Sequence, residues 1–292
     1  MDTLAINVLN GLQLSMLAFL LALGLTLIFG MMDYLNLAHG AFYTIGAYAG
    51  FSVARFSGSF WLALAVAFLV PALLGALFQY FMLKPLVRGG RSTHLDIALF
   101  TLGLSFAVIG VVEMVYGAGY DTIATPGYLS GSVSVFGVGY PTYRLFIIAL
   151  GVAVGAGVWL VMDRSTIGAT VRAAVDDHDM TVGMGVNVDR LFALVFGFGA
   201  GLAGLAGAVA APVLSVYSHM GMDILILTLI VVIAGGLGSI MGSFVAALAI
   251  GLINTFAQAY LPGLESFAMY IFLALILAFN PGGFFRVARS AG

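Results

Sequence analysis

The sequence predicts an all-α, polytopic membrane protein, and three observations support this fold class. First, 62% of the 292 residues are hydrophobic and 8% are charged, whereas soluble domains carry about 25% charged residues. Second, apolar runs long enough to cross a bilayer recur along the whole chain. Third, glycine, which is commoner in transmembrane than in soluble helices, occurs 39 times. This composition excludes an ordinary soluble enzyme and a disordered chain, and the net charge of −2 argues against a nucleic-acid partner.

The apolar runs predict about 8–9 transmembrane helices, some of them short, tilted or broken, in a single domain over residues 1–292. We expect the first run to be a retained helix rather than a cleaved signal, because Met1, Asp2 and Thr3 provide no basic region before it. The runs fall at residues 8–30, 40–54, 60–83, 95–117, 143–162, 191–212, 223–237, 239–259 and 265–280.

The distribution of basic residues predicts the orientation in the membrane. Eight of the 10 Lys and Arg residues lie in three regions, and even numbers of predicted spans separate these regions. Because Lys and Arg gather in cytoplasmic loops, we expect all three regions inside, a cytoplasmic C-terminus and an N-terminus outside. The regions contain Lys84, Arg88 and Arg91, then Arg164, Arg172 and Arg190, and finally Arg286 and Arg289.

Residues 117–142 are expected to form an external loop. The segment is rich in Gly, Ser, Thr and Pro and lacks an apolar run of spanning length. Alternating Ser and Val at residues 132–135 allow a short β-hairpin or an extended lid.

Residues 163–190 form a charged island with eight charged residues. Arg172 and Asp176 are four residues apart, which places both on one face of a helix. Glycines then end this helix, and Asn187 or Asp189 can cap the next one. The island is either a solvated loop or, as we favour, one or two short helices that dock a cytoplasmic partner. It contains Asp163, Arg164, Arg172, Asp176, Asp177, Asp179, Gly183, Gly185, Asn187, Asp189 and Arg190.

The chain carries no visible energy source or catalytic motif. The single lysine, Lys84, has no glycine cradle of the P-loop type. The four histidines are scattered, and the patterns of zinc proteases and serine hydrolases are absent. Few ionisable residues lie within the spans, which argues against a proton- or sodium-coupled carrier. We therefore expect no enzyme activity, metal or cofactor in this chain. If transport is driven by ATP, we expect ATP-Mg to be bound by partner subunits.

Two segments are candidates for the translocation pathway. Asp33, Asn36 and His39 form a polar stripe between two apolar runs, which is either a cytoplasmic turn or a broken helix that lines a cavity. The cluster of Gly235, Gly236, Gly238 and Ser239 predicts packing and a helix break rather than phosphate binding. The candidate pathway residues are Asn36, His39, Gly235, Gly236, Gly238 and Ser239.

Other small residues predict close helix packing. Gly197 and Gly201 form a G-x-x-x-G pair, which permits a close crossing. Residues 39–48 and 238–247 are weakly alike, which raises the hypothesis of two halves of an inverted repeat.

Four segments resemble the bacterial branched-chain amino acid ABC transporter permeases of the LivH type. They are LNLAHGAFYTIGAY (35–48), KPLVRGGRSTHLDIALFTLGLS (84–105), GATVRAAVDDHDMTVGMGVNVDRLFAL (168–194) and AGGLGSIMGSFVAALAIGL (234–252). The resemblance runs through nearly the whole chain in the right order.

This resemblance implies an inner-membrane permease that pairs with a LivM-like second permease, two cytoplasmic ATPase subunits and a periplasmic substrate-binding protein. The family's coupling segment falls on Arg172 through Asn187, within the charged island. Thr181 and Gly183 depart from the family's pattern, and Gly183 weakens the coupling helix by about 1 kcal/mol relative to alanine. The implied ATPase-coupling residues are Arg172, Asp176, Asp177, Asp179, Gly185 and Asn187.

The resemblance implies import of branched-chain amino acids by alternating access between the two permease chains. Similar permeases serve urea, short amides and small organic acids, so a related importer for these solutes is the alternative. A stand-alone channel or secondary carrier is the rival from another class.

Overall fold

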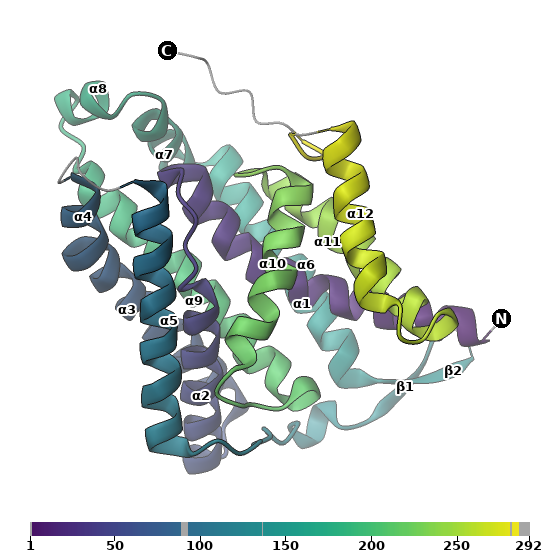
Figure 1. Ribbon diagram of the computed structural model, residues 1–292. Coiled ribbons are helices and arrows are strands. Elements are labelled where there is room, and N and C mark those ends of the chain that lie inside the picture. The colour runs from purple at the N-terminus through teal and green to yellow at the C-terminus, as the bar shows by residue number, and fades with distance from the viewer. Residues whose placement is uncertain (1, 89–92, 136, 281, 286–292) are drawn as a thin grey trace.

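The computed structural model describes residues 2–88, 93–135, 137–280 and 282–285. In Figure 1 these residues form helices joined by short connections and one small β-hairpin. The elements are α1 (Asp2–Met32), α2 (His39–Ser57), α3 (Phe60–Phe78), a π-helical turn (Gln79–Leu83), α4 (Lys84–Arg88), α5 (His94–Tyr116), a 3₁₀ turn (Gly127–Leu129), β1 (Ser132–Val135), β2 (Val138–Pro141), α6 (Thr142–Arg164), α7 (Thr166–Asp176), α8 (His178–Gly183), α9 (Val188–Leu214), α10 (Met220–Gly235), α11 (Ile240–Tyr260) and α12 (Glu265–Phe279).

The helical prediction is confirmed, because every predicted apolar run coincides with a helix. Six helical segments of the described residues are long and apolar enough to cross a membrane, namely those built on α1, α3, α5, α6, α9 and α11. α10 and most of α12 are shorter apolar helices. Hydroxyl side chains start several helices: Ser59 caps α3, Thr93 caps α5 and Ser239 caps α11.

α1 is the central helix of the fold. In its most apolar window 89% of the residues are buried, against 28% in α5 and 22% in α6. α1 packs against α6, α9, α10 and α11, while α3 lies on the far side of α9. The outer helices therefore keep broad apolar faces for lipid or a partner chain, and α1 keeps almost none.

Glycines let the central helices cross with their backbones in contact. A Cβ atom at Gly46 of α2 would overlap the backbone of Gly204 in α9, and one at Gly24 of α1 would overlap the carbonyl of Gly199. Gly197 also packs on α3, where its Cβ would meet the Ala72 carbonyl oxygen. This confirms the close crossing predicted from the glycines of α9.

The two ends of the molecule differ. One end carries α7 and α8, and we call it the α8 end. The other carries β1, β2 and the rest of residues 117–142, and we call it the loop end; Figure 1 shows the two far apart. β1 and β2 pair antiparallel, with Ser132 opposite Pro141 and Val135 opposite Val138, so the hairpin alternative is the one that forms.

Candidate functional site

The first two basic regions meet at the α8 end. Lys84 from the first region lies 3.1 Å from Asp189 of the charged island, and its Nζ atom stands 4.5 Å from the centre of the Tyr80 ring. The Arg172 guanidinium donates to the Met162 carbonyl oxygen, which ties α7 to the end of α6. Arg91, Arg286 and Arg289 lie outside the described residues.

The charged island folds into two short helices that are joined at Asp177. The Asp177 backbone N–H donates to the Ala173 carbonyl and so closes α7, while its carboxylate accepts from the Met180 N–H at 2.8 Å and opens α8. The prediction that the first helix ends at the glycines is wrong, because α7 ends at Asp176 with Asp177 as its C-cap. An aspartate before a helical stretch is an ordinary N-cap signal and could have shown the break.

α8 ends where the glycines predicted. Its last residue is Gly183, and Gly185 then adopts a left-handed conformation with φ of 87°. Asn187 caps α9, because its amide oxygen accepts from the Arg190 N–H at 3.0 Å. Asp179 is exposed and its carboxylate lies 3.2 Å from Nδ1 of His178.

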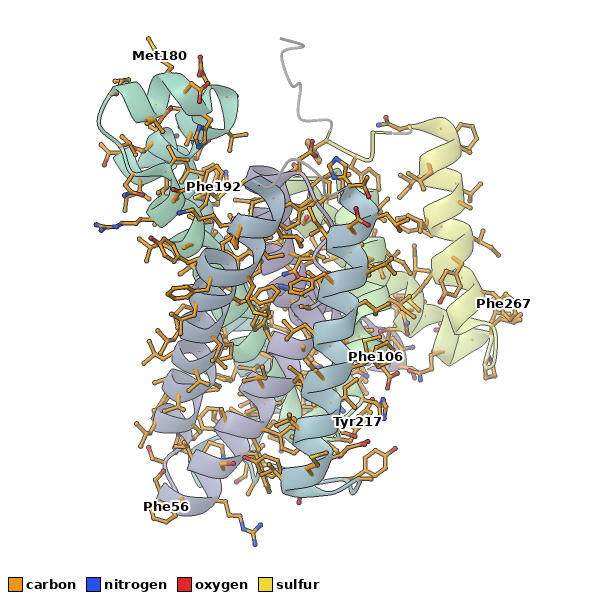
Figure 2. The ribbon with its side chains drawn as sticks, turned by 60° about the vertical axis from the view of Figure 1, so that its left-hand side comes forward. Phe56, Phe106, Met180, Phe192, Tyr217 and Phe267 are labelled. Atoms are coloured by element: carbon orange, nitrogen blue, oxygen red, sulfur yellow. The ribbon has the colours of Figure 1, made fainter. Side chains whose placement is uncertain are left out.

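The tip of the island is apolar, a feature that the sequence reading missed. Met180 and Met184 expose 65% and 77% of their surface, and Val182 between them exposes 49%. Figure 2 shows Met180 at the outermost point of this end. We call these three residues the α8 tip. The predictions for the island rest on its charged residues alone, although the sequence also contains the Met-x-Val-x-Met pattern.

Arg172 and Asp176, which their spacing predicted to share one face of a helix, both line one cavity. The cavity of about 480 Å³ lies between α1, α6, α7 and α11, and its lining also includes Gly30 and Gly238. The island thus contacts the central helix at the point where the turn between α10 and α11 crosses it.

The turn between α10 and α11 is a true helix break. α10 ends at Gly235, and Gly236 and Gly238 have φ of 99° and 83°, which favour glycine. The Ser239 hydroxyl then accepts from the Gly242 N–H at 3.0 Å and starts α11. The break lies at the α8 end, where Gly238 approaches the Cα atom of Gly30.

The segment between α1 and α2 lies within the helical layer. α1 ends at Met32, and Asp33 adopts a left-handed conformation with φ of 56°. Asn36 and His39 are fully buried; the Asn36 amide oxygen accepts from the Ala38 N–H at 3.1 Å, and Nε2 of His39 lies 2.9 Å from the Leu21 carbonyl oxygen. The segment is therefore a helix break in which Asn36 and His39 have no exposed surface, whereas Asp33 and Leu35 are exposed.

Two hydroxyl groups of α5 form hydrogen bonds with the backbone of this break. Thr101 Oγ1 accepts from the Leu37 N–H at 3.1 Å, and Ser105 Oγ donates to the Leu37 carbonyl at 3.0 Å. Thr101 lies seven residues into α5, about 10 Å from its start at 1.5 Å per residue. The backbone of Leu37 thus reaches well below the α8 end, and α2 starts inside the layer.

Replacing Thr101 with valine and Ser105 with alanine together is expected to lower the free energy of unfolding by about 1–3 kcal/mol for each Leu37 group left unpaired. Thermal unfolding of the purified chain in detergent measures this loss. Thr170→Val is the matched control, because the Thr170 hydroxyl bonds only within its own helix, to Thr166 at 2.8 Å. Equal melting temperatures for the double variant and the control would contradict the role of α5.

The pathway candidates of the two breaks occupy different places. Asn36 and His39 lie at the depth of Thr101 and of Leu21 of α1. The second set lies at the α8 end and consists of Gly235, Gly236, Gly238 and Ser239. There the backbone N–H groups of Phe284 and Phe285 donate hydrogen bonds to the carbonyls of Ala234 and Gly235. The structure does not bring the two sets into one cluster, and their role in transport stays a prediction.

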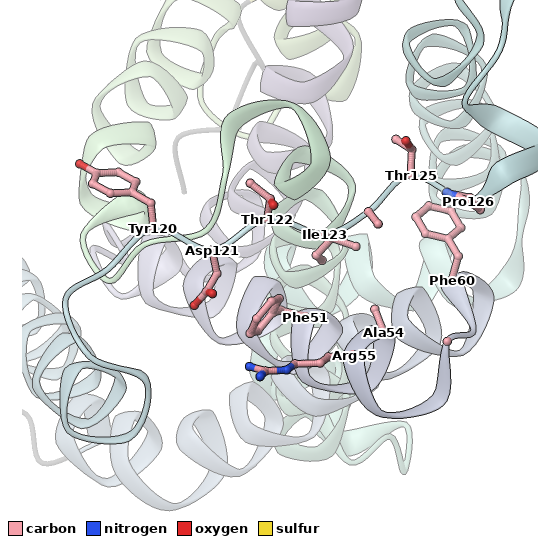
Figure 3. Close-up of a pocket in the computed structure, with 12 residues that line it drawn as sticks. Phe51, Ala54, Arg55, Phe60, Tyr120, Asp121, Thr122, Ile123, Thr125 and Pro126 are labelled. Carbon is pink, nitrogen blue, oxygen red and sulfur yellow. The ribbon is translucent and has the colours of Figure 1, made fainter.

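A cavity of about 650 Å³ opens at the loop end, between the end of α2 and residues 120–126. Figure 3 shows Phe51 and Arg55 of α2 and Asp121 of the loop on the same side of it. Asp121 is held by two backbone hydrogen bonds with Val216, at 2.9 and 2.7 Å. Charges of opposite sign therefore border an opening whose wall includes an aromatic ring.

A second polar cluster joins α5 to the start of α10. Glu113 accepts from the Ser218 hydroxyl at 2.9 Å and lies 3.2 Å from Nε2 of His219. Asp223 accepts from the Tyr217 hydroxyl at 2.8 Å. These residues lie near helix ends, as the sequence reading expected for Glu113 and Asp223.

Comparison with known proteins assigns the family. A family model described as the permease component of branched-chain amino acid transport systems matches residues 7–279. The high-affinity branched-chain amino acid permease LivH of Salmonella typhimurium is 26% identical over 284 residues, 92% of each chain. The corresponding protein BraD of Pseudomonas aeruginosa is 27% identical over 288 residues, 94% of this chain and 93% of its own.

A second kind of permease is also similar. LivM of Escherichia coli is 24% identical over 310 residues, which cover 94% of this chain and 69% of LivM. No solved structure gives a significant match. The match to the permease model, nearly the full length of the described helices, shows that this multi-pass membrane protein is a transport component and not an enzyme, and that it belongs to the branched-chain amino acid transport permease family.

Proposed function

We propose that this chain is the transmembrane permease subunit of an ATP-driven importer in the bacterial inner membrane. It takes branched-chain amino acids from a periplasmic binding protein and moves them by alternating access. The observation that carries the proposal is the α8 tip: a compact helical unit presents apolar side chains at the end where the first two basic regions meet.

The α8 tip suits docking to a cytoplasmic ATPase. Exposed methionine and valine side chains fill apolar pockets of a partner, and methionine adapts its shape to them. α7 and α8 follow α6 and precede α9 in the chain, and Arg172, Asp176 and Gly238 border one cavity. Movement of a docked ATPase would therefore reach both the central helix and the break between α10 and α11.

The same geometry supports an orientation in the membrane. With the α8 end in the cytoplasm, the Lys84 and Arg172 regions lie inside and the N-terminus lies outside, as the positive-inside rule requires. The loop end then faces the periplasm, where the binding protein delivers its substrate. The similarity to LivM supports a pore made of two related permease chains.

Reconstitution tests the proposal. In proteoliposomes that contain this chain, a LivM-like permease and two ATPase subunits, we expect uptake of radiolabelled leucine that requires both ATP and the binding protein. A non-hydrolysable ATP analogue serves as the control. Leucine uptake by this chain alone would contradict the proposal in favour of a channel or carrier. ATP-dependent uptake of urea but not leucine would assign the substrate class to small amides.

A further inference from the structure

A cavity of about 450 Å³ at the loop end is lined by an unusual number of polar side chains for so apolar a chain. It lies between α1, α6, α9 and α11, and its volume is within the range of about 300–1,000 Å³ that small-molecule sites occupy. None of its lining residues is acidic. The polar residues of the lining are Asn7, Asn10, Gln13, Arg144, Thr255 and Gln258.

The spacing of these residues along α1 and α11 puts their side chains next to one another. Asn7, Asn10 and Gln13 recur every three residues on α1, and Thr255 and Gln258 do so on α11. Residues three apart are neighbours on a helix surface. Because α1 and α11 pack against each other, the two polar rows border the same space.

One of these polar groups is buried without a partner. Asn7 is nine-tenths buried, and its Nδ2 atom has no hydrogen-bond partner in the described structure. Gln13 and Thr255 of the lining are buried as well. An unpaired buried amide costs free energy that leucine at the same position would not cost. A bound polar solute removes that cost.

Arg144 gives the cavity a fixed positive group. One guanidinium nitrogen donates to the Asn10 amide oxygen at 2.6 Å, and the Tyr140 hydroxyl donates to the same oxygen at 3.1 Å. The anchored guanidinium keeps further N–H groups, whose planar fork matches a carboxylate. With a single cation and no acidic residue in the lining, the cavity favours a ligand that carries a carboxylate.

The remaining wall is apolar. Leu14, Leu17 and Val213 line the cavity beside the polar rows. This surface suits a short aliphatic chain, while the amide oxygens and the Thr255 hydroxyl are neutral acceptors for an amino group.

We propose that this cavity is a substrate-binding site for a small aliphatic amino acid. Arg144 holds its carboxylate, the amide and hydroxyl groups of α1 and α11 hold its amino group, and Leu14, Leu17 and Val213 contact its side chain. The inference rests on the proposed function and names the site at which this chain holds its substrate.

Cysteine labelling in the assembled transporter tests the site directly, because the native chain has no cysteine. Gln13→Cys and Thr255→Cys are each treated with a small methanethiosulfonate reagent, with and without leucine. We expect both to be labelled, and saturating leucine to slow labelling at least fivefold, whereas leucinamide and urea leave the rate unchanged. Ser134→Cys, on the exposed hairpin, is the control and should be labelled equally in every condition.

The outcomes separate the site from the function. If the transporter imports leucine but neither cysteine is protected or labelled, the site is overturned and the proposed function stands. Protection by leucinamide or urea equal to that by leucine overturns the carboxylate assignment. If the transporter with native residues imports no leucine, the proposed function fails instead.

Asn7→Leu distinguishes a binding role from a structural one. It removes the unpaired amide, so we expect an unchanged or higher melting temperature together with at least a tenfold rise in the leucine concentration for half-maximal uptake. Arg144→Gln should abolish protection of Gln13→Cys by leucine, and Arg144→Lys should restore part of it. Unchanged leucine dependence in Asn7→Leu would overturn the proposal.

Discussion

Replacing Met180 and Met184 together with aspartate is expected to abolish co-purification of the ATPase subunits and to reduce leucine uptake at least tenfold. Both side chains are largely exposed in the chain described here, so the substitution leaves its own folding intact. In the docked complex, however, each carboxylate would be buried in an apolar pocket without a partner, which costs several kcal/mol. Pull-down of the ATPases and uptake in proteoliposomes measure the two effects.

Met114→Asp is the matched control for this pair. Met114 exposes 88% of its surface and lies in the last turn of α5, away from the α8 end. We expect ATPase association to be unchanged in this variant. Association retained by the Met180 and Met184 double variant would show that the α8 tip does not dock the ATPase. Asp177→Ala, which removes the cap of α8, should weaken association less, because the tip stays apolar.

Replacing Gly46 with leucine is expected to prevent recovery of a monodisperse, folded chain. The backbones of Gly46 and Gly204 are in contact, so no side chain fits without separating α2 from α9. Overpacking a core costs about 1–3 kcal/mol even where neighbours can move, and here the obstacle is backbone. Gly46→Ala should have an intermediate effect. Size-exclusion chromatography and thermal unfolding in detergent measure the loss.

Gly110→Leu provides the comparison at a helical glycine of α5 that has no neighbouring atom within 4 Å of an added Cβ. Its melting temperature should stay equal to or above that of the native chain, since glycine is a poor helix former. If Gly46→Leu and Gly110→Leu were equally stable, the close crossing of α2 and α9 would not hold the fold together.

The helices were predictable because the bilayer imposes strict requirements. Lipid offers no hydrogen bonds to the backbone, so every long apolar run must be helical. Asn187, one of the two residues predicted to cap a helix, does start α9, because its side chain accepts from a backbone N–H of the first turn. The depth of the segment before α2 was not predictable, because it depends on Thr101 and Ser105, more than 60 residues away in the sequence.

The candidate sites were predictable in unequal degree. The charged island was recognisable because charged residues are rare in this chain. Its position at one end of the molecule was predictable because charged residues are costly inside a bilayer. The polar cavity was missed, although Asn7, Asn10 and Gln13 repeat every three residues at the start of the first apolar run. Its second wall comes from Thr255 and Gln258, and which helix packs on α1 depends on tertiary contacts that periodicity does not contain.

The burial of α1 has a consequence for how the protein is made. α1 is synthesised well before its partners α9 and α11: the buried hydroxyls of Thr26 and Ser243, 2.7 Å apart, are separated by 217 positions in sequence. At a synthesis rate of about 5–20 residues per second, roughly 10–40 s pass before this pair can form. α6, which also packs on α1, is made earlier, so α1 lacks only its later partners during that time and its burial is completed only once α11 has been made.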